Sequence, residues 1–329
     1  MSIANASASP SIDWHTIEQA HSRVRPHIHR TPVLTSTSIN RVAGAQLFFK
    51  CENLQKTGSF KIRGATNAIF SLTENEIRNG VVTHSSGNHA AAVACAAAWR
   101  GARAFIVMPE NAPKVKCRAV ESYGGTITFC EPNVKSRAET AARVQAETGA
   151  VMIHPYDDDR IIAGQATTAK ELLEDFPELE VVLAPVSGGG LLSGTCLGAK
   201  GVRPGVRVYG CEPQRADDAY RSIMTGKLQP LETSDTIADG LRATLAPRTF
   251  AILQRLVDGI LLVAEEEIVA AMRLFWERMK IVVEPSSAVT LAPRLRSEGL
   301  HEMGLDGRSS AALPKIGVVI SGGNVELKW

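Results

Sequence analysis

Residues 56–64 of this 329-residue chain read Lys-Thr-Gly-Ser-Phe-Lys-Ile-Arg-Gly. The segment predicts the start of a helix, because Ser59 can cap it and apolar residues recur near helical spacing from Phe60 to Leu72. It also contains Lys61, whose amine can bind an aldehyde covalently if its surroundings keep it unprotonated. The ordinary explanation of Lys61 is a solvated surface lysine, as most lysines are. Chemistry at Lys61 therefore needs support from other segments.

The composition is that of an ordinary globular protein. The chain is 44% hydrophobic and 21% charged, with a formal net charge of +2. Both signs of charge are interspersed, which argues against a nucleic-acid partner, and no apolar run approaches the roughly 20 residues that span a membrane. Residues 1–10 lack the pattern of a signal peptide, and the six cysteines lack metal-ligand spacing. We therefore expect a cytoplasmic protein with reduced thiols, a small-molecule substrate, and no nucleic-acid or membrane partner.

Short apolar runs alternate with helical patterns along most of the chain. Strands are predicted at 46–50, 81–84, 103–108, 126–130, 151–154, 181–186, 206–211, 260–263 and 316–320. Helices are predicted at 12–24, 60–72, 89–100, 112–123, 136–147, 161–176, 190–200, 216–225, 247–255, 265–279 and 286–298. Strands separated by helices favour parallel pairing in open α/β sheets, and the length favours two lobes that share a cleft.

A glycine run follows the predicted strand at 181–186 and opens a helix. Residues 185–191 read Pro-Val-Ser-Gly-Gly-Gly-Leu, so the backbone can turn sharply there. The N–H groups of such a turn can converge on a phosphate at the helix N-terminus. A plain tight turn explains a glycine triplet equally well. The spacing matches neither a phosphate loop that ends in Gly-Lys-Ser/Thr nor the full dinucleotide fingerprint.

Two further loops follow predicted strands. Residues 83–89 read Thr-His-Ser-Ser-Gly-Asn-His, and hydroxyl donors at a helix N-terminus suit a carboxylate. The ordinary explanation of that loop is a Ser or Asn that caps its own helix. Residues 318–324 read Val-Val-Ile-Ser-Gly-Gly-Asn, which a strand-end turn explains as well. All three loops follow strands, and ligands of open α/β sheets bind beyond the carboxyl ends of strands.

Together these segments, in this chain order, resemble the pyridoxal phosphate (PLP) enzymes of the threonine dehydratase and serine racemase family. The resemblance extends from Arg30 to Asn324. It implies a two-domain α/β fold with open, twisted, parallel-rich sheets, similar to the tryptophan synthase β subunit and other fold type II PLP enzymes. A large PLP-binding domain is expected at 1–72 and 158–329, and a small mobile substrate-binding domain at 73–157. A homodimer is expected from the family alone.

The resemblance assigns cofactor-binding roles. Lys61 is expected to bind the PLP aldehyde, residues 187–191 its phosphate, and Ser321 its pyridine nitrogen. A neutral hydroxyl at that nitrogen makes the ring a weaker electron sink, which favours β-elimination over transamination. Ser187 departs from the family, which usually has a fourth glycine there, and phosphate binding is expected to remain intact. The residues expected to contact the cofactor are Phe60, Lys61, Asn88, Ser187, Gly188, Gly189, Gly190, Leu191, Glu284 and Ser321.

The resemblance also assigns substrate-binding and catalytic roles. Lys61 is the expected base at the substrate Cα, and Ser86, on the opposite face of the ring, is the second catalytic residue as in serine racemases. The plain alternative for Ser86 is a carboxylate-binding hydroxyl. Arg137 can reach a second carboxylate with its guanidinium fork, or be a solvated arginine paired with a nearby acid. The expected substrate contacts are Ser85, Ser86, Gly87, Asn88, His89 and Arg137.

Residues 212–218, Glu-Pro-Gln-Arg-Ala-Asp-Asp, resemble the divalent-cation site of the same family. The resemblance implies that Glu212, the carbonyl of Ala216 and Asp218 bind Mg²⁺, with Ca²⁺ or Mn²⁺ as alternatives. Without the resemblance, two carboxylates in a loop are better explained as a solvated surface.

Within the family, the resemblance is strongest to the 3-hydroxyaspartate dehydratases. Residues 276–280 and 283–288 resemble the serine racemase-like branch, and residues 154–158 resemble dehydratases more than animal racemases. We expect an ammonia-lyase that converts a β-hydroxy amino acid, 3-hydroxyaspartate above others, to a 2-oxo acid (oxaloacetate) and ammonia. A serine racemase or a serine/threonine dehydratase is the alternative within the family, and a catalytically silent ligand-binding protein is one outside it. A dinucleotide-dependent oxidoreductase is disfavoured, because the glycine run begins late, at residue 188, without a clear acidic partner.

Overall fold

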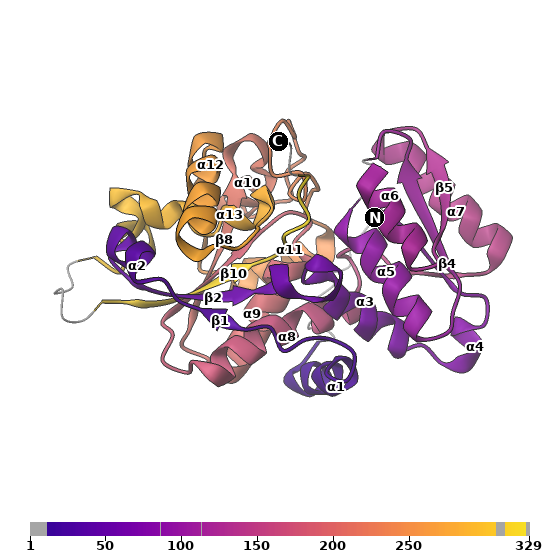
Figure 1. The fold of residues 1–329 in the computed structure, drawn as a ribbon, viewed down its shortest axis with the longest axis horizontal. Helices are drawn as coiled ribbons and strands as arrows, with labels where there is room; N and C mark the ends of the chain where they lie inside the picture. The colour runs from indigo at the N-terminus through magenta and orange to yellow at the C-terminus, as the bar shows by residue number, and fades with distance from the viewer. Residues whose placement is uncertain (1–11, 86, 113, 307–312, 327–329) are drawn as a thin grey trace, which may run out of the picture.

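The computed structural model describes residues 12–85, 87–112, 114–306 and 313–326. These residues form two open sheets flanked by helices, the larger on the left of Figure 1 and the smaller, with β4 and β5, on the right. The α/β architecture with parallel-rich sheets, predicted from the sequence, is confirmed. The division into a large and a small mobile domain remains a prediction. Among the described helices, none is long and apolar enough to cross a membrane.

The larger sheet has the strand order β1-β2-β10-β7-β8-β9. Its strands are β1 (Val33–Leu34), β2 (Gln46–Cys51), β7 (Val181–Pro185), β8 (Arg207–Pro213), β9 (Gly259–Val263) and β10 (Lys315–Ile320). Neighbouring strands pair in parallel, except that β1 pairs antiparallel with β2. Every residue of β7 is buried, and so is β10 after its first residue. Helices therefore cover both faces of the sheet, as is typical of parallel strands.

The smaller sheet has the order β5-β4-β3-β6, with all neighbours parallel. Its strands are β3 (Val81–His84), β4 (Ala104–Pro109), β5 (Thr126–Cys130) and β6 (Val151–Met152). The alanine-rich helix α5 (Asn88–Trp99) is buried from His89 to Ala97 and shares one apolar core with α3 (Lys61–Phe70). Its short side chains let α3 approach closely, so Lys61 lies at the junction of the two sheets.

The remaining helices surround the sheets. They are α1 (Trp14–Val24), α2 (Thr37–Ala43), α4 (Glu74–Ile77), α6 (Lys114–Ser122), α7 (Val134–Thr148), α8 (Asp159–Asp175), α9 (Gly190–Val202), α10 (Asp218–Thr225), α11 (Pro247–Leu256), α12 (Glu265–Leu274) and α13 (Pro285–Ala288). Local signals explain several ends. In α7, Asn133 accepts the N–H of Ser136 (2.7 Å), and Gly149 ends the helix in the left-handed region (φ 70°).

Helix α3 is held against α8 by close packing of glycines. A Cβ added at Gly164 of α8 would lie 2.6 Å from the Cα of Gly64 in α3. No side chain fits between the two helices there, since cores are already packed at crystal-like density. Gly64 is three residues after Lys61, so this contact fixes the first turn of α3.

Buried charged residues join α3 to the larger sheet. Arg63 donates to Glu52 through Nε (2.7 Å) and to Glu171 through its terminal nitrogens (2.9 and 2.8 Å). Lys50 also donates to Glu171 (2.7 Å), and all four side chains are at most 3% exposed. Two positive and two negative groups balance one another, as buried charges require. The cluster anchors α3 two residues after Lys61.

The structure differs from the sequence prediction at several elements. The helix predicted at 265–279 ends at Leu274 and continues as a π-helical turn at Phe275–Met279. The helix predicted at 286–298 is replaced by α13 and by 3₁₀ turns at Ala292–Leu295 and Ser297–Gly299. Strand β6 has two residues rather than four. The sequence does not predict β1 or α2, because elements of two and seven residues contain too short an apolar pattern.

Candidate active site between the two sheets

The amine of Lys61 lies half-buried at the first turn of α3. Its Nζ donates a hydrogen bond to the carbonyl of Pro155 (2.9 Å) and lies 5.1 Å from the ring centre of Phe60. Burial lowers the pKa of Lys61 to about 8, although the carboxylate of Glu284 acts in the opposite direction. An amine with this pKa is partly unprotonated near neutral pH, as nucleophilic attack on an aldehyde requires.

Ser59 does not cap α3, contrary to the sequence prediction. It is extended (φ −162°, ψ 161°) and bridges to Gly322, while Phe60 is the N-cap of the helix. The N–H of Phe60 donates to the carbonyl of Ser321 (2.9 Å). The backbone at Ser59 and Phe60 is therefore hydrogen-bonded to the end of β10, and the Ser59 hydroxyl does not cap the helix. That buried hydroxyl has no partner within the described part of the chain, so it could accept or donate a bond to a ligand.

A pair of buried hydroxyls marks the end of β10. Ser321 is 2% exposed, and its Oγ lies 3.0 Å from the Oγ of Ser287. Ser287 also accepts the N–H of Gly322 (2.7 Å) and donates to its carbonyl (2.6 Å). Ser287 thus fixes the turn that carries Ser321. The sequence analysis did not identify Ser287, which lies in the segment 283–288 but 34 residues before its partner.

Asn88 and Glu284 connect the two sheets. The Nδ2 of Asn88 donates to both carboxylate oxygens of Glu284 (2.9 and 3.0 Å), and its Oδ1 accepts from Asn324 (2.9 Å). Burial raises the pKa of Glu284 to about 7, and the bond from Asn88 opposes that shift. Both residues were expected near the cofactor ring, and the structure brings them together. Asn324, which fixes the orientation of the Asn88 amide, was not assigned a role from sequence.

The glycine run forms a turn at the N-terminus of α9. Gly189 is the N-cap and has φ 87°, a conformation that favours glycine. A Cβ at Gly188 would lie 2.5 Å from ring atoms of Tyr156, so the loop at 154–158 packs directly on the turn. The Ser187 hydroxyl accepts the N–H of Ala243 (3.0 Å), which ties the turn to the segment before α11. Leu191, the next expected contact, is buried in the α9 core.

Three aromatic rings line the loop beside Lys61. His154 lies edge-on to Tyr156 (4.7 Å between ring centres) and to His84 (5.6 Å). Burial lowers the pKa of His84 to about 4, so its ring is neutral at physiological pH. The segment at 154–158 was singled out in the sequence, but His84 carried no signal beyond its place at a strand end.

The expected substrate loop lies at the start of α5. The N–H of Gly87 donates to the Ser85 hydroxyl (3.3 Å), and Gly87 is the N-cap of α5. His89 is buried, and its Nε2 lies 3.2 Å from the carbonyl of Ile153. Burial lowers the pKa of His89 well below its usual value, so this ring is neutral and faces the smaller sheet. Ser86, predicted as the second catalytic residue, lies outside the described residues.

Arg137 is half-buried on α7. Burial lowers the pKa of His84 and raises that of Tyr156; the charge of Arg137 adds to the first shift and opposes the second. Among the described residues, no acid forms an ion pair with Arg137. Both explanations of Arg137, a contact to the substrate and a solvated arginine, remain predictions.

Glu212 and Asp218 form a buried carboxylate pair between β8 and α10. Each is 1% exposed; Glu212 accepts the N–H groups of Ala219 (3.0 Å) and Tyr220 (2.8 Å), and Asp218 accepts that of Leu245 (3.0 Å). Burial raises the pKa of Asp218 to about 6 and that of Glu212 well above its usual range.

No described cation forms an ion pair with either carboxylate, so a bound metal ion would relieve their repulsion. Ala216 is buried in the 3₁₀ turn at Gln214–Ala216, which lies between Glu212 and Asp218 in the sequence. The described part of the chain holds no cluster of three or more His, Cys, Asp or Glu side chains suited to a metal. A cation at Glu212 and Asp218 would therefore depend on carbonyl and water ligands, as is usual for hard cations.

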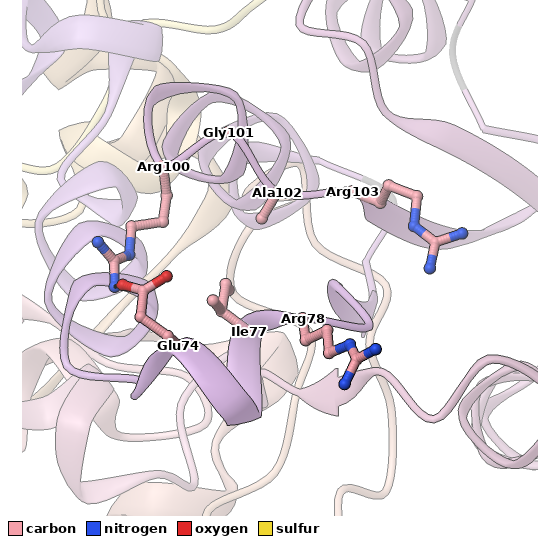
Figure 2. Close-up of a pocket in the computed structure, with 7 residues that line it drawn as sticks. All are labelled: Glu74, Ile77, Arg78, Arg100, Gly101, Ala102 and Arg103. Carbon is pink, nitrogen blue, oxygen red and sulfur yellow. Dashed lines mark hydrogen bonds and ion pairs between the residues drawn. The ribbon is translucent and has the colours of Figure 1, made fainter.

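A separate cavity of about 400 Å³ lies beside α4 and the end of α5 (Figure 2). An ion pair between Arg100 and Glu74 (2.5 Å) lies along it. None of the expected site residues lines this cavity, which is bordered by Glu74, Ile77, Arg78, Arg100, Gly101, Ala102 and Arg103.

The residues between the two sheets fit PLP. Lys61 presents an amine with a lowered pKa, and the glycine turn presents the N-terminus of α9, where an anion binds favourably. Ser321 and the unpartnered Ser59 supply hydroxyls at the end of β10. An aldehyde, a phosphate and a polar ring edge would each find a suitable group here.

Comparisons with known proteins agree with this chemistry. Residues 24–305 match the family described as pyridoxal-phosphate dependent enzyme. The chain is 48% identical to serine racemase of Dictyostelium discoideum, over 94% of each protein. It is also 48% identical to beta-hydroxyaspartate dehydratase of Paracoccus denitrificans (strain Pd 1222), over 94% of this chain and 95% of that protein.

A comparison with solved structures gives the same family. Maize serine racemase superposes with a TM-score of 0.91 at 47% identity, covering 96% of this chain and 95% of that chain. Sequence and fold thus agree over almost the whole length. This chain belongs to the family of pyridoxal-phosphate dependent enzymes, as a fold type II member related to serine racemases and dehydratases.

Proposed function

We propose that this enzyme dehydrates and deaminates a β-hydroxy amino acid to a 2-oxo acid and ammonia, with 3-hydroxyaspartate as the preferred substrate and oxaloacetate as its product. The observation that carries the proposal is the Lys61 amine, whose pKa burial lowers to about 8, between the glycine turn and the loop at Pro155. When bound, PLP withdraws electrons from an attached amino acid and so makes its Cα–H bond more acidic.

Each residue of the chain then has a defined task. The Lys61 Nζ removes the Cα proton, since a neutral amine is an effective base near its own pKa. The Ser321 hydroxyl would hold the ring nitrogen of the cofactor without a full charge, which would favour prompt loss of the β-hydroxyl as water. Asn88, held by Glu284 and Asn324, would orient the edge of the cofactor ring. The N–H groups at the start of α5 receive the substrate α-carboxylate.

The preference for a dicarboxylic substrate rests on Arg137. It has no acidic partner among the described residues, and its charge acts on His84 and Tyr156 beside Lys61. A guanidinium fork in that place matches the side-chain carboxylate of hydroxyaspartate. The relative from Paracoccus denitrificans, which is named for this activity, supports the same choice.

We also propose that Glu212, the carbonyl of Ala216 and Asp218 bind a divalent cation, with Mg²⁺ preferred. This proposal is supported by the burial of the two carboxylates and by the lack of an ion pair to either of them within the described residues. A cation there would act structurally, because Leu245, which donates to Asp218, lies two residues after Ala243, the partner of Ser187 in the glycine turn.

Serine racemisation is the second candidate function. The chain is 48–49% identical to serine racemases of Dictyostelium discoideum and rice. The sequence also retains Ser86, which the family resemblance puts on the ring face opposite Lys61. Replacing Ser86 by Ala and measuring elimination from each serine enantiomer tests this role. Equal losses for the two enantiomers would argue against face-specific proton transfer.

The decisive experiment combines absorbance with a product assay. The purified protein should be yellow from the lysine-bound cofactor, and Lys61→Ala should abolish both that absorbance and turnover. Keto acid, ammonia and enantiomer release should be measured with L-serine, D-serine, threonine and both hydroxyaspartate diastereomers. Hydroxyaspartate should have the highest kcat/KM. A yellow protein that releases neither product nor the opposite enantiomer would instead be a catalytically silent binding protein.

A further inference from the structure

Lys116 and Asp239 form an ion pair between the parts of the chain that carry the two sheets. The Nζ of Lys116, on α6 beside the smaller sheet, lies 2.5 Å from Oδ2 of Asp239, in the segment between α10 and α11 of the larger one. Their side chains are 20% and 43% exposed. Neither residue belongs to the cofactor or substrate sets described above. The two are 123 residues apart in the chain, so no sequence motif joins them.

The Lys116 ammonium also lies against the start of α5. A Cβ added at Gly87 would be 3.4 Å from the Nζ of Lys116 and 3.8 and 3.9 Å from its last two methylene carbons. The end of the Lys116 side chain therefore runs along the Cα of Gly87. Gly87 is the N-cap of α5, where the free N–H groups already favour a negative charge. Lys116 adds an ammonium group to that place, and Asp239 offsets part of its charge.

Asp239 is in turn fixed to the larger sheet. The N–H of its neighbour Gly240 donates to the hydroxyl of Ser286 (2.9 Å), two residues after Glu284. Three residues after Gly240, the N–H of Ala243 donates to Ser187 of the glycine turn (3.0 Å). The carboxylate of Asp239 is thus a fixed anchor for a lysine of the other sheet.

We propose that Lys116 is a positioning residue for substrate binding: Asp239 holds its ammonium beside Gly87, where it draws the substrate α-carboxylate to the start of α5. The inference rests on the proposed function in one respect, that this loop receives the carboxylate. A half-exposed ion pair contributes little to the free energy of unfolding. The role of Lys116 is therefore expected in KM and its salt dependence, because rim charges govern the capture of charged ligands.

Substitution of Lys116 in the PLP-loaded enzyme tests the charge. Lys116→Met keeps most of the length of the side chain but removes the ammonium. In this variant KM for L-serine should rise by about 5- to 20-fold, and kcat should change by less than about twofold. Lys116→Arg should stay within about threefold of the wild-type KM. Raising the KCl concentration should raise KM of the wild type more than that of Lys116→Met. Lys135→Met, at an exposed lysine of α7 paired with Glu139, is the matched control.

A charge reversal tests the anchor separately. In Lys116→Glu, two carboxylates repel each other where the ion pair was, so the contact beside α5 is lost. Amide hydrogen exchange at residues 87–99 should therefore become faster. Adding Asp239→Lys remakes the pair with opposite sign and should restore slow exchange, while KM stays high because a carboxylate now faces the substrate.

Two results would overturn the proposal: an unchanged KM in Lys116→Met, or exchange that the double reversal leaves fast. If Lys116→Met does not fold, Asp239→Asn takes its place and must raise KM by a smaller factor. A wild-type enzyme that neither binds nor converts any amino acid would sink the proposed function instead, and the exchange measurement would still test the ion pair.

Discussion

Asn88 and Glu284 link the parts of the chain that carry the two sheets, the Asn88 amide donating to both carboxylate oxygens at 2.9 and 3.0 Å. Asn88 opens α5 beside the smaller sheet, and Glu284 precedes α13 beside the larger one. The carboxylate is buried, which raises its pKa to about 7. The contact therefore joins the parts of the chain that carry the two sheets through a carboxyl group whose pKa lies near physiological pH.

Glu284→Gln should stabilise the cofactor-free protein at alkaline pH. The pKa of Glu284 is higher in the folded chain than in the unfolded one, so folding binds a proton and stability falls as pH rises from about 4.5 to 7. Above pH 7 the buried carboxylate is ionised, and the free energy of unfolding is reduced by the full amount. Glutamine removes the charge, and the gain at pH 8.5 should be about 1 to 3 kcal/mol.

Urea unfolding of wild type and Glu284→Gln at pH 5 and 8.5 measures this difference. The gain should shrink toward pH 5, where the wild-type carboxyl is protonated. Glu277→Gln, at an exposed carboxylate, is the control. A gain of the same size at both pH values would contradict the assignment of the titration to Glu284.

Lys61 should react with PLP at a lower pH than an exposed lysine does. Only the neutral amine attacks the aldehyde, and burial lowers the pKa of Lys61 to about 8. The rate of cofactor addition to the cofactor-free chain should rise from pH 7 and level off above about 8. Stopped-flow absorbance measures this profile, with Lys61→Ala as the blank. A rate that still climbs in proportion to hydroxide up to pH 10 would refute the lowered pKa.

Arg137→Ala should impair hydroxyaspartate far more than serine. A hydrogen-bonded charge pair with the second carboxylate contributes about 1.5 to 3 kcal/mol, so kcat/KM for hydroxyaspartate should fall by about 10- to 100-fold. Serine has no such carboxylate and should be little affected. Arg143→Ala, on the exposed side of the same helix α7, is the matched control. Equal losses for both substrates would remove Arg137 from substrate selection.

Mg²⁺ should raise the melting temperature of the wild type but not of Asp218→Asn. At 100 times its Kd, a cation adds about 2.7 kcal/mol to the free energy of unfolding. Asparagine keeps an acceptor for the N–H of Leu245 but removes the charge that the cation needs. Protons compete with the cation, so the effect should weaken as pH falls through about 6, the pKa to which burial raises Asp218. A Mg²⁺ shift that persists in Asp218→Asn would put the cation elsewhere.

Arg63→Met should destabilise the fold by about 3 to 5 kcal/mol, because it leaves buried carboxylates without their partner. Glu52 and Glu171 both accept bonds from Arg63, and both side chains are almost fully buried. Denaturant unfolding measures the loss. The exposed Arg30, which pairs with Asp175, is the control, and Arg30→Met should cost less than about 1 kcal/mol. A loss of that small size for Arg63→Met would show that the cluster does not hold α3.

Local sequence patterns were sufficient for most elements and failed where the pattern was short or where the backbone had a distant partner. The apolar run of β7 and the alanine pattern of α5 are long enough to identify a strand and a helix by themselves. Ser59 has the chemistry of a helix cap, yet its bridge to Gly322 prevents it from capping α3. That partner is more than 260 residues away, and no local propensity could reveal it.

The sequence by itself determined the family of this protein and identified Lys61 as the lysine expected to bind the cofactor, because residues 56–64, the glycine run and the loop ending at Asn324 each carry a local motif. Only the tertiary structure decided which side chains meet. Lys61 reaches Pro155, Asn88 reaches Glu284, and Lys116 reaches Asp239, across separations of 94, 196 and 123 residues. Strand order and core packing create such contacts, and these depend on the whole chain at once.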